Sequence, residues 1–206
     1  LEVARNRLEQ ALRLRPDHLQ ALEDLQALLV SQGAWSAAKP HLERLVELSR
    51  IPARRAEHTL TLAKVLAALG EEEQAIELYQ RGLEDLPHIG EGHLELGQLL
   101  FERDPERARR HLEYAICSLD APPLEATARL SLADLLERVF MAPDLAAGHL
   151  QHALTLNGAH RPATSCLLAK VHGRAGRWGL AIHALEEAIR IAPTQARQAE
   201  LWADMA

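Results

Sequence analysis

The sequence predicts an all-α protein made of repeated helix pairs, and its composition, its apolar spacing and a recurring motif carry that prediction. The 206 residues include 39 Leu and 35 Ala, but only 19 Val, Ile and Thr together, and 3% are aromatic. Leu and Ala favour helices, whereas β-branched and aromatic residues favour strands. A largely β protein is therefore disfavoured, and the length allows one domain or two.

A motif that marks one helix of each pair recurs along the chain. The pattern A-x3-[L/Y]-x2-[A/G]-x4-P occurs at residues 4–16, 75–87 and 181–193, and weaker copies begin at Ala38, Ala108 and Ala146. Each copy predicts an amphipathic helix that ends where proline or glycine interrupts it.

A second apolar helix precedes most of these segments. Its leucines fall at helical spacing, and the turn that follows is marked by Gly33, Gly70, Gly176 or a Pro-Asp combination. Ala75 and Ala181 are separated by three periods of about 34 residues plus small insertions. The pattern predicts pairs of antiparallel helices.

A period of this length made of two helices resembles the tetratricopeptide repeat family. The resemblance covers essentially the whole chain. It implies small residues where paired helices approach, namely Ala38, Ala63, Ala75, Gly97, Ala108, Ala133, Ala146, Ala169 and Ala181. Trp35 and Trp178 match the aromatic residue that begins second helices in the family. The resemblance also implies a right-handed superhelical solenoid whose first helices line the concave side.

The expected organisation is a single solenoid over residues 1–206. It starts with the second helix of a truncated repeat, 1–16, continues with helix pairs in 17–52, 53–88, 89–122, 123–160 and 161–194, and ends with a helix in 195–206. Pro52 and Pro122 lie late in their repeats, so longer connections are expected there. Since Leu1 begins inside an amphipathic pattern, we expect the chain to be part of a longer protein.

Charge and composition exclude several classes of function. Acidic residues outnumber Lys and Arg by 29 to 23, which argues against a nucleic-acid binder. The chain has no apolar run long enough for a membrane span and no signal-peptide pattern. Cys117 and Cys166 have no metal-type spacing and are expected to be reduced core thiols. We expect a cytoplasmic protein.

Catalytic motifs are absent from the sequence, so we expect no enzyme activity, no cofactor and no metal. GxGxxG, Walker, HExxH and GxSxG patterns do not occur. His149 and His152 have the spacing of two metal ligands on one helix. No third ligand is evident beside them, and we interpret them as surface residues.

The resemblance implies that groove-facing residues of the first helices contact a partner. These positions are Gln20, Glu23, Glu57, Leu60, Lys64, Glu91, Leu94, Gln98, Phe101, Glu102, Leu130, Asp134, Glu137, Arg138, Lys170 and Arg174. The alternative is a plain solvated helix face. Leu60, Leu94 and Phe101 favour a covered groove, unless the next repeat buries them.

These residues predict a protein-interaction scaffold that docks a peptide or helical segment of a partner. The positions of the second to fourth repeats are mostly acidic and the later ones lean basic, so a partner segment would lie with its Lys or Arg part along the former. Acidic Glu23, Glu91 and Glu95 argue against an adaptor for chaperone C-terminal tails. The alternatives are a docking arm of a larger enzyme, such as a glycosyltransferase, sulfotransferase or oxygenase, and self-association through exposed solenoid ends.

Overall fold

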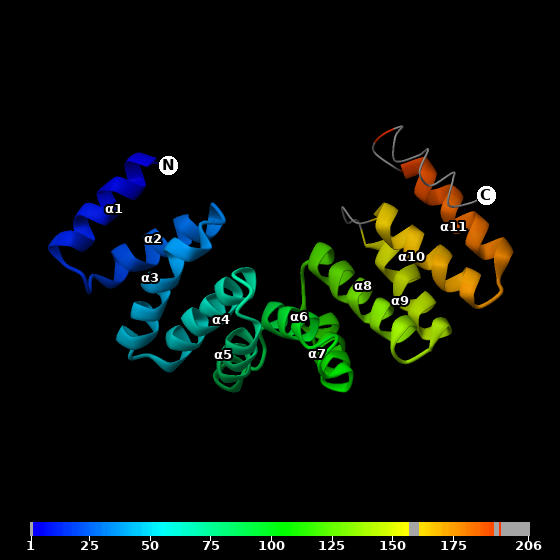
Figure 1. Ribbon diagram of the computed structural model, residues 1–206, viewed down its shortest axis with the longest axis horizontal. Helices are drawn as coiled ribbons and strands as arrows, with labels where there is room; N and C mark the ends of the chain where they lie inside the picture. Colours follow the sequence, from blue (N-terminus) through cyan, green and yellow to red (C-terminus); the bar gives the residue numbers. More distant parts are fainter. Residues whose placement is uncertain (1, 157–160, 192–193, 195–206) are drawn as a thin grey trace. The chain divides into compact units, whose positions relative to one another are not determined.

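A computed structural model describes residues 2–156, 161–191 and 194, and these form eleven α-helices with no strand in the described ranges (Figure 1). The helices are α1 (Glu2–Leu14), α2 (Leu19–Ser31), α3 (Trp35–Leu48), α4 (Pro52–Ala68), α5 (Glu72–Asp85), α6 (Gly90–Leu99), α7 (Pro105–Ser118), α8 (Pro122–Arg138), α9 (Pro143–Thr155), α10 (Arg161–Arg174) and α11 (Trp178–Ile191). The predicted all-α helical solenoid is confirmed.

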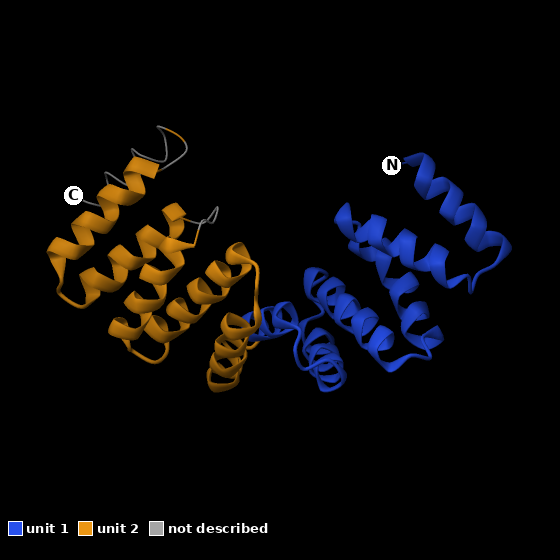
Figure 2. Cartoon of the chain, turned by 180° about the vertical axis from the view of Figure 1, so that it is seen from behind, with its two compact units in different colours: residues 1–99 blue, residues 100–206 orange. Residues whose placement is uncertain are grey.

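The chain divides into two compact units, residues 1–99 and residues 100–206, which we call unit 1 and unit 2 (Figure 2). Within unit 1, α2 packs on α3, α3 on α4, and α4 on α5. Within unit 2, α8 packs on α9, α9 on α10, and α10 on α11. Within each unit, each helix thus packs on its neighbours in the chain, as in a repeat protein. The right-handed sense of the superhelix and the division into repeats stay predictions.

The positions of two prolines differ from the expectation. Pro52 and Pro122 do not lengthen the connections; each occupies the first turn of a 17-residue helix, α4 and α8. Proline is tolerated there because the first amide groups of a helix have no partner within the helix. The additional residues therefore extend two first helices.

The nine small residues assigned to the helix contacts are all buried. Ala63, Ala133, Ala38, Ala75, Ala108 and Ala146 have no exposed surface, Ala169 and Ala181 are 4% and 7% exposed, and Gly97 is buried. The turn glycines Gly33, Gly70 and Gly176 have φ between 67° and 81°, where a residue without Cβ is least strained. The register of the repeat is therefore correct at these positions.

The N-terminal helix α1 has no buried residue, and Leu14 is 85% exposed. Among the described helices α1 packs on α2, and one neighbouring helix is not enough to bury the apolar face of a repeat helix. The helix expected in 195–206 lies outside the described residues. Cys117 is exposed, so its assignment to the core was wrong, and Cys166 is half-buried.

Candidate functional site

A pocket of about 210 Å³ in unit 1 collects four of the predicted groove residues. They are Glu57, Leu60 and Lys64 of α4 and Glu91 of α6; the remaining lining residues are Thr61, Tyr79, Ile89, Gly92 and Glu95. Residues spaced by three, four or seven positions share one face of a helix. The α4 stripe and the Glu91–Glu95 pair of α6 thus line one pocket.

The floor of this pocket, which we call the unit 1 pocket, is apolar because two glycines make room for a leucine. Leu60 is 9% exposed. A Cβ on Gly82 of α5 would lie 2.7 Å from Leu60 Cδ2, and a Cβ on Gly92 of α6 would lie 3.4 Å from the same atom. Any larger residue at Gly82 would displace the leucine. Ile89, 39% exposed, adds an apolar edge.

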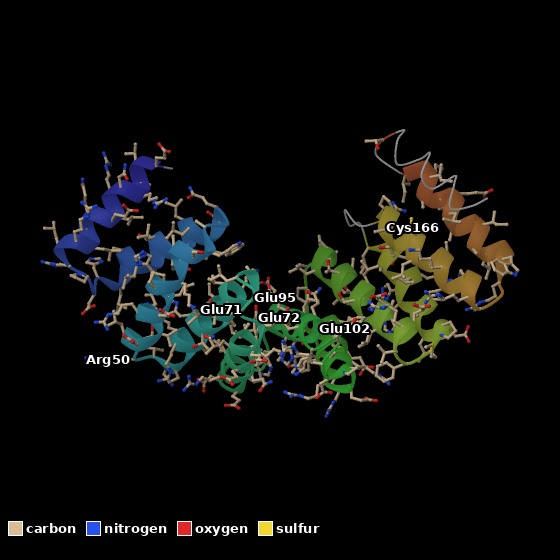
Figure 3. The ribbon with its side chains drawn as sticks, viewed as in Figure 1. Arg50, Glu71, Glu72, Glu95, Glu102 and Cys166 are labelled. Carbon is tan, nitrogen blue, oxygen red and sulfur yellow. The ribbon has the colours of Figure 1, made fainter. Side chains whose placement is uncertain are left out.

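One carboxylate of the unit 1 pocket, that of Glu95 (labelled in Figure 3), is held by two partners. Lys64 Nζ lies 2.8 Å from Glu95 Oε1, and the buried Tyr79 hydroxyl donates a hydrogen bond to Glu95 Oε2. The hydrogen bond to Glu95 raises the pKa of Lys64. Burial, together with the nearby Glu95 carboxylate, raises the pKa of Tyr79. Lys64 therefore stays charged and Tyr79 stays a donor at neutral pH.

Two acidic residues on the rim of the pocket lack such partners. Glu57 and Glu91 are exposed, and neither forms an ion pair with any residue in the described ranges. Glu57, Glu91 and Glu95 against Lys64 give the pocket a net charge of −2, from three negative charges and one positive charge. The lining is thus apolar at the base and acidic at the rim.

The remaining predicted positions of unit 1 are engaged within the unit. Glu23 Oε1 lies 3.6 Å from both Arg54 Nη1 and His58 Nε2, and Gln20 donates to Asp24 at 2.9 Å. Leu94 is 4% exposed and belongs to the core. For Leu94 the structure thus agrees with the alternative of burial by neighbouring helices. Gln98 is exposed.

In unit 2 one arginine, Arg138, contacts three of the other predicted groove residues. The Arg138 guanidinium lies 2.9 Å from Glu102 Oε1 and 3.2 Å from Asp134 Oδ2. Its Cζ also lies 5.1 Å from the centroid of the half-buried Phe101 ring, within cation–π range. Phe101 is therefore covered by a residue of its own unit.

The last predicted positions of unit 2 divide into one pair and two separate residues. Buried Glu137 accepts a hydrogen bond from exposed Arg174. Leu130 is half-buried. Lys170 is exposed and lines a pocket of about 400 Å³ between α10 and α11, beside Cys166, Trp178 and Ile182. It forms no ion pair with a residue in the part of the chain that the structure describes.

The described residues offer no obvious place for a metal ion. No group of three or more His, Cys, Asp or Glu side chains is suitably arranged in the described ranges. His149 Nδ1 lies 3.5 Å from Arg129 Nη1, and burial lowers the pKa of His149. Crossing a membrane would require a longer and more apolar helix than any in the described part of the chain.

Sequence reasoning missed Glu95, Tyr79 and Ile89 as lining residues of the unit 1 pocket. A usable signal exists in the spacing of opposite charges. Lys39 and Glu71 pair across 32 residues, as Arg138 and Glu102 do across 36. Lys64 and Glu95 are also about one repeat apart. Oppositely charged residues separated by one period therefore mark contacts between neighbouring repeats.

Comparison with known proteins supports the fold. A tetratricopeptide repeat family model matches residues 27–88. No curated protein matches the chain significantly. A chain of the APC/C hetero-tetramer Cut9-Hcn1 is similar to 98% of this chain, with 19% identity and a TM-score of 0.76; the match spans 38% of that longer chain.

Two further solved structures are similar over most of both chains. YrrB, described as a tetratricopeptide repeat protein with an unusual peptide-binding site, matches 95% of this chain and 97% of its own, with 16% identity and a TM-score of 0.71. PilF of Pseudomonas aeruginosa matches 91% and 82%, with 20% identity and a TM-score of 0.72. The resemblance to the tetratricopeptide repeat family is thus confirmed, in sequence over residues 27–88 and in fold over most of the chain, with no individual member identified.

Proposed function

We propose that this protein is an interaction scaffold that docks a peptide or helical segment of a partner protein along its first helices. The observation that carries the proposal is the unit 1 pocket, whose base is apolar and whose rim is acidic. The fold supports it, because solenoids of helix pairs present extended surfaces to partners. The peptide-binding site named for YrrB is consistent with the same use of the fold.

The charge of the pocket selects the partner segment. Glu57 and Glu91 form no ion pair with a residue in the described ranges, so a lysine or arginine of the segment can pair with them. Apolar neighbours of that cation would cover Leu60 and Ile89. Because the contacts are semi-exposed, each charge pair contributes at most about 1 kcal/mol, and binding weakens as salt rises.

In unit 2, an acidic side chain of a partner would meet a basic residue in this proposal. Arg138 and Arg174 are already paired within the unit. Lys170, which has no ion-pair partner in the described ranges, is therefore the basic residue that would contact it.

We propose a cytoplasmic location, where the free thiols of Cys117 and Cys166 would stay reduced. No described residue favours the alternative of a docking arm of an enzyme.

The test is peptide display on the wild-type protein and on the double variant Glu57→Lys with Glu91→Lys. The wild type should enrich peptides that carry Lys or Arg beside Leu or Ile, and the double variant should lose them. The control is Glu77→Lys with Glu84→Lys, which makes the same charge change at exposed positions of α5. Equal binding by all three proteins, with helicity intact, would place the binding surface elsewhere, and concentration-dependent mass would indicate self-association.

A further inference from the structure

Glu95 is the best-prepared acceptor in the unit 1 pocket. Its side chain is 27% exposed, and Oε2 accepts the hydrogen bond of the Tyr79 hydroxyl. Tyr79 is 1% exposed, so this donor is fixed by the core of unit 1. A carboxylate has room for about four hydrogen bonds. Glu95 can therefore keep the tyrosine and still bind a cation through Oε1.

Lys64 occupies that remaining position in the free protein. Its ammonium nitrogen lies 2.8 Å from Glu95 Oε1, and its side chain is 48% exposed. It is the only basic residue among those that line the pocket. A lysine side chain has a flexible stem and a strongly hydrated head, so Lys64 can leave Glu95 for water without movement of α4.

We propose that Glu95 is the residue that recognises an arginine side chain of the partner, and that Lys64 is its stand-in until the partner arrives. This proposal rests on the proposed function. A guanidinium is planar and carries five donors, so it can reach Glu95 and a rim carboxylate together, which one ammonium does less well. Its aliphatic stem would lie on Leu60. Lys64 then weakens binding, because it competes for Glu95.

Removal of the stand-in therefore strengthens binding. The variant Lys64→Met keeps the length of the stem and changes the charge of the pocket from −2 to −3. Since a half-exposed ion pair of this kind is worth less than about 1 kcal/mol, the variant should bind an arginine peptide about two- to fivefold more tightly. Glu95→Gln should weaken binding by about tenfold.

Lys39 provides a matched control. Its ammonium lies 2.8 Å from both carboxylate oxygens of Glu71, the residue that precedes α5 in unit 1. The Lys39 side chain is 28% exposed and does not line the pocket. Lys39→Met should leave peptide affinity unchanged, and Lys64→Arg, which retains the competing charge, should not tighten binding.

The experiment measures fluorescence anisotropy with a short labelled peptide that contains arginine between leucines. The same peptide with citrulline, the neutral isostere of arginine, shows whether binding depends on the positive charge of the arginine. If the arginine peptide binds neither the wild type nor Lys64→Met, docking of a cation in unit 1 is wrong. If binding depends on Glu57 and Glu91 but Lys64→Met weakens it or leaves it unchanged, only the stand-in role is overturned.

A second measurement follows Lys64 directly. The chain contains three lysines, Lys39, Lys64 and Lys170, so reductive methylation with carbon-13 gives three lysine signals, besides that of the N-terminal amine, and keeps the charges of the lysines. Addition of the arginine peptide should move the Lys64 signal toward that of a free lysine and leave Lys39 in place. A Lys64 signal that is unchanged in the saturated complex would show that Lys64 stays on Glu95, and the proposal would be wrong.

Discussion

The two units carry the same kind of first-helix residues but use them differently. In unit 1, Lys64 pairs with one carboxylate, and Glu57 and Glu91 keep no ion-pair partner in the described ranges. In unit 2, Arg138 pairs with both Glu102 and Asp134 and covers Phe101. Glu57 and Glu91 of unit 1 are therefore open to a partner, whereas the charged groove residues of unit 2, apart from Lys170, are paired within the unit.

The comparison shows that groove position alone does not define a binding site. The predicted groove positions of unit 2 include three cations, Arg138, Arg174 and Lys170, and three carboxylates, Glu102, Asp134 and Glu137, so their charges sum to zero. The unit 1 pocket sums to −2. Much of the difference arises because unit 2 pairs its carboxylates with an arginine, Arg138, and unit 1 with a lysine, Lys64. The planar guanidinium of arginine can bind two carboxylates at once.

The largest effect is expected when a large side chain is forced between paired helices. Ala75→Trp in unit 1 and Ala181→Trp in unit 2 should each destabilise the protein by about 1–3 kcal/mol or more, because both alanines are buried where helices pack closely. Hydrogen exchange should show faster opening mainly in the unit that carries the change. The control Glu77→Trp, at an exposed position of α5, should change stability by less than about 0.5 kcal/mol.

A second effect, summed over five histidines, is a loss of stability in acid. Burial lowers the pKa of His41, His58 and His93 in unit 1 and of His149 and His172 in unit 2. The folded chain thus binds fewer protons than the unfolded chain. Stability is complete above the ordinary value of 6.5 and falls as the pH drops below it.

Thermal melts between about pH 7.5 and about pH 5 measure this loss. His58→Gln should flatten the decline, since His58 is 8% exposed and its Nε2 has no hydrogen-bond partner. The groups that act on its charge are Glu23, Glu57 and Arg54. A melting temperature that is constant over this range would contradict the prediction.

The difference between the units also explains what the sequence could and could not predict. The small residues Ala63 and Ala133 were predictable, because backbone approach of two helices requires a small residue at a fixed place in each repeat. The ion pair of Glu95 with Lys64 leaves a signal in the one-period spacing of opposite charges, but the hydrogen bond from Tyr79 leaves none, because the hydroxyl reaches Glu95 from another helix, α5. The cover of Phe101 by Arg138 depends on a side-chain conformation, which a repeat register does not determine.

Removal of one charge from a pair should cost more in unit 2 than in unit 1. Glu137 is 7% exposed and Glu95 is 27% exposed. Arg174→Met leaves a buried carboxylate without its donor and should cost about 1–3 kcal/mol. Lys64→Met leaves Glu95 its hydrogen bond from Tyr79 and should cost less than about 1 kcal/mol. Urea unfolding curves give both values, and equal costs would show that burial of the carboxylate is not the deciding factor.

The smallest change in stability is expected for Arg138→Met. This variant tests whether unit 2 binds a cation once its groove carboxylates, like Glu57 and Glu91 of unit 1, have no ion-pair partner. Arg138 lies at the surface, with a side chain that is 50% exposed. Its removal leaves Glu102 and Asp134 without this partner and uncovers Phe101. The predicted groove positions of unit 2 then carry a net charge of −1.

The measurement uses the background of Glu57→Lys with Glu91→Lys, in which unit 1 no longer binds a cationic peptide. Arg138→Met should then restore weak, salt-sensitive binding of an arginine peptide to unit 2, because carboxylates beside an apolar ring are again available. The matched control is Arg109→Met on α7, which removes a cation that lies over Phe140 and pairs with Glu113. If the control variant also restores binding, net charge alone explains the effect. If neither variant binds, a site requires a fixed acceptor such as Glu95, which the Tyr79 hydroxyl holds in unit 1.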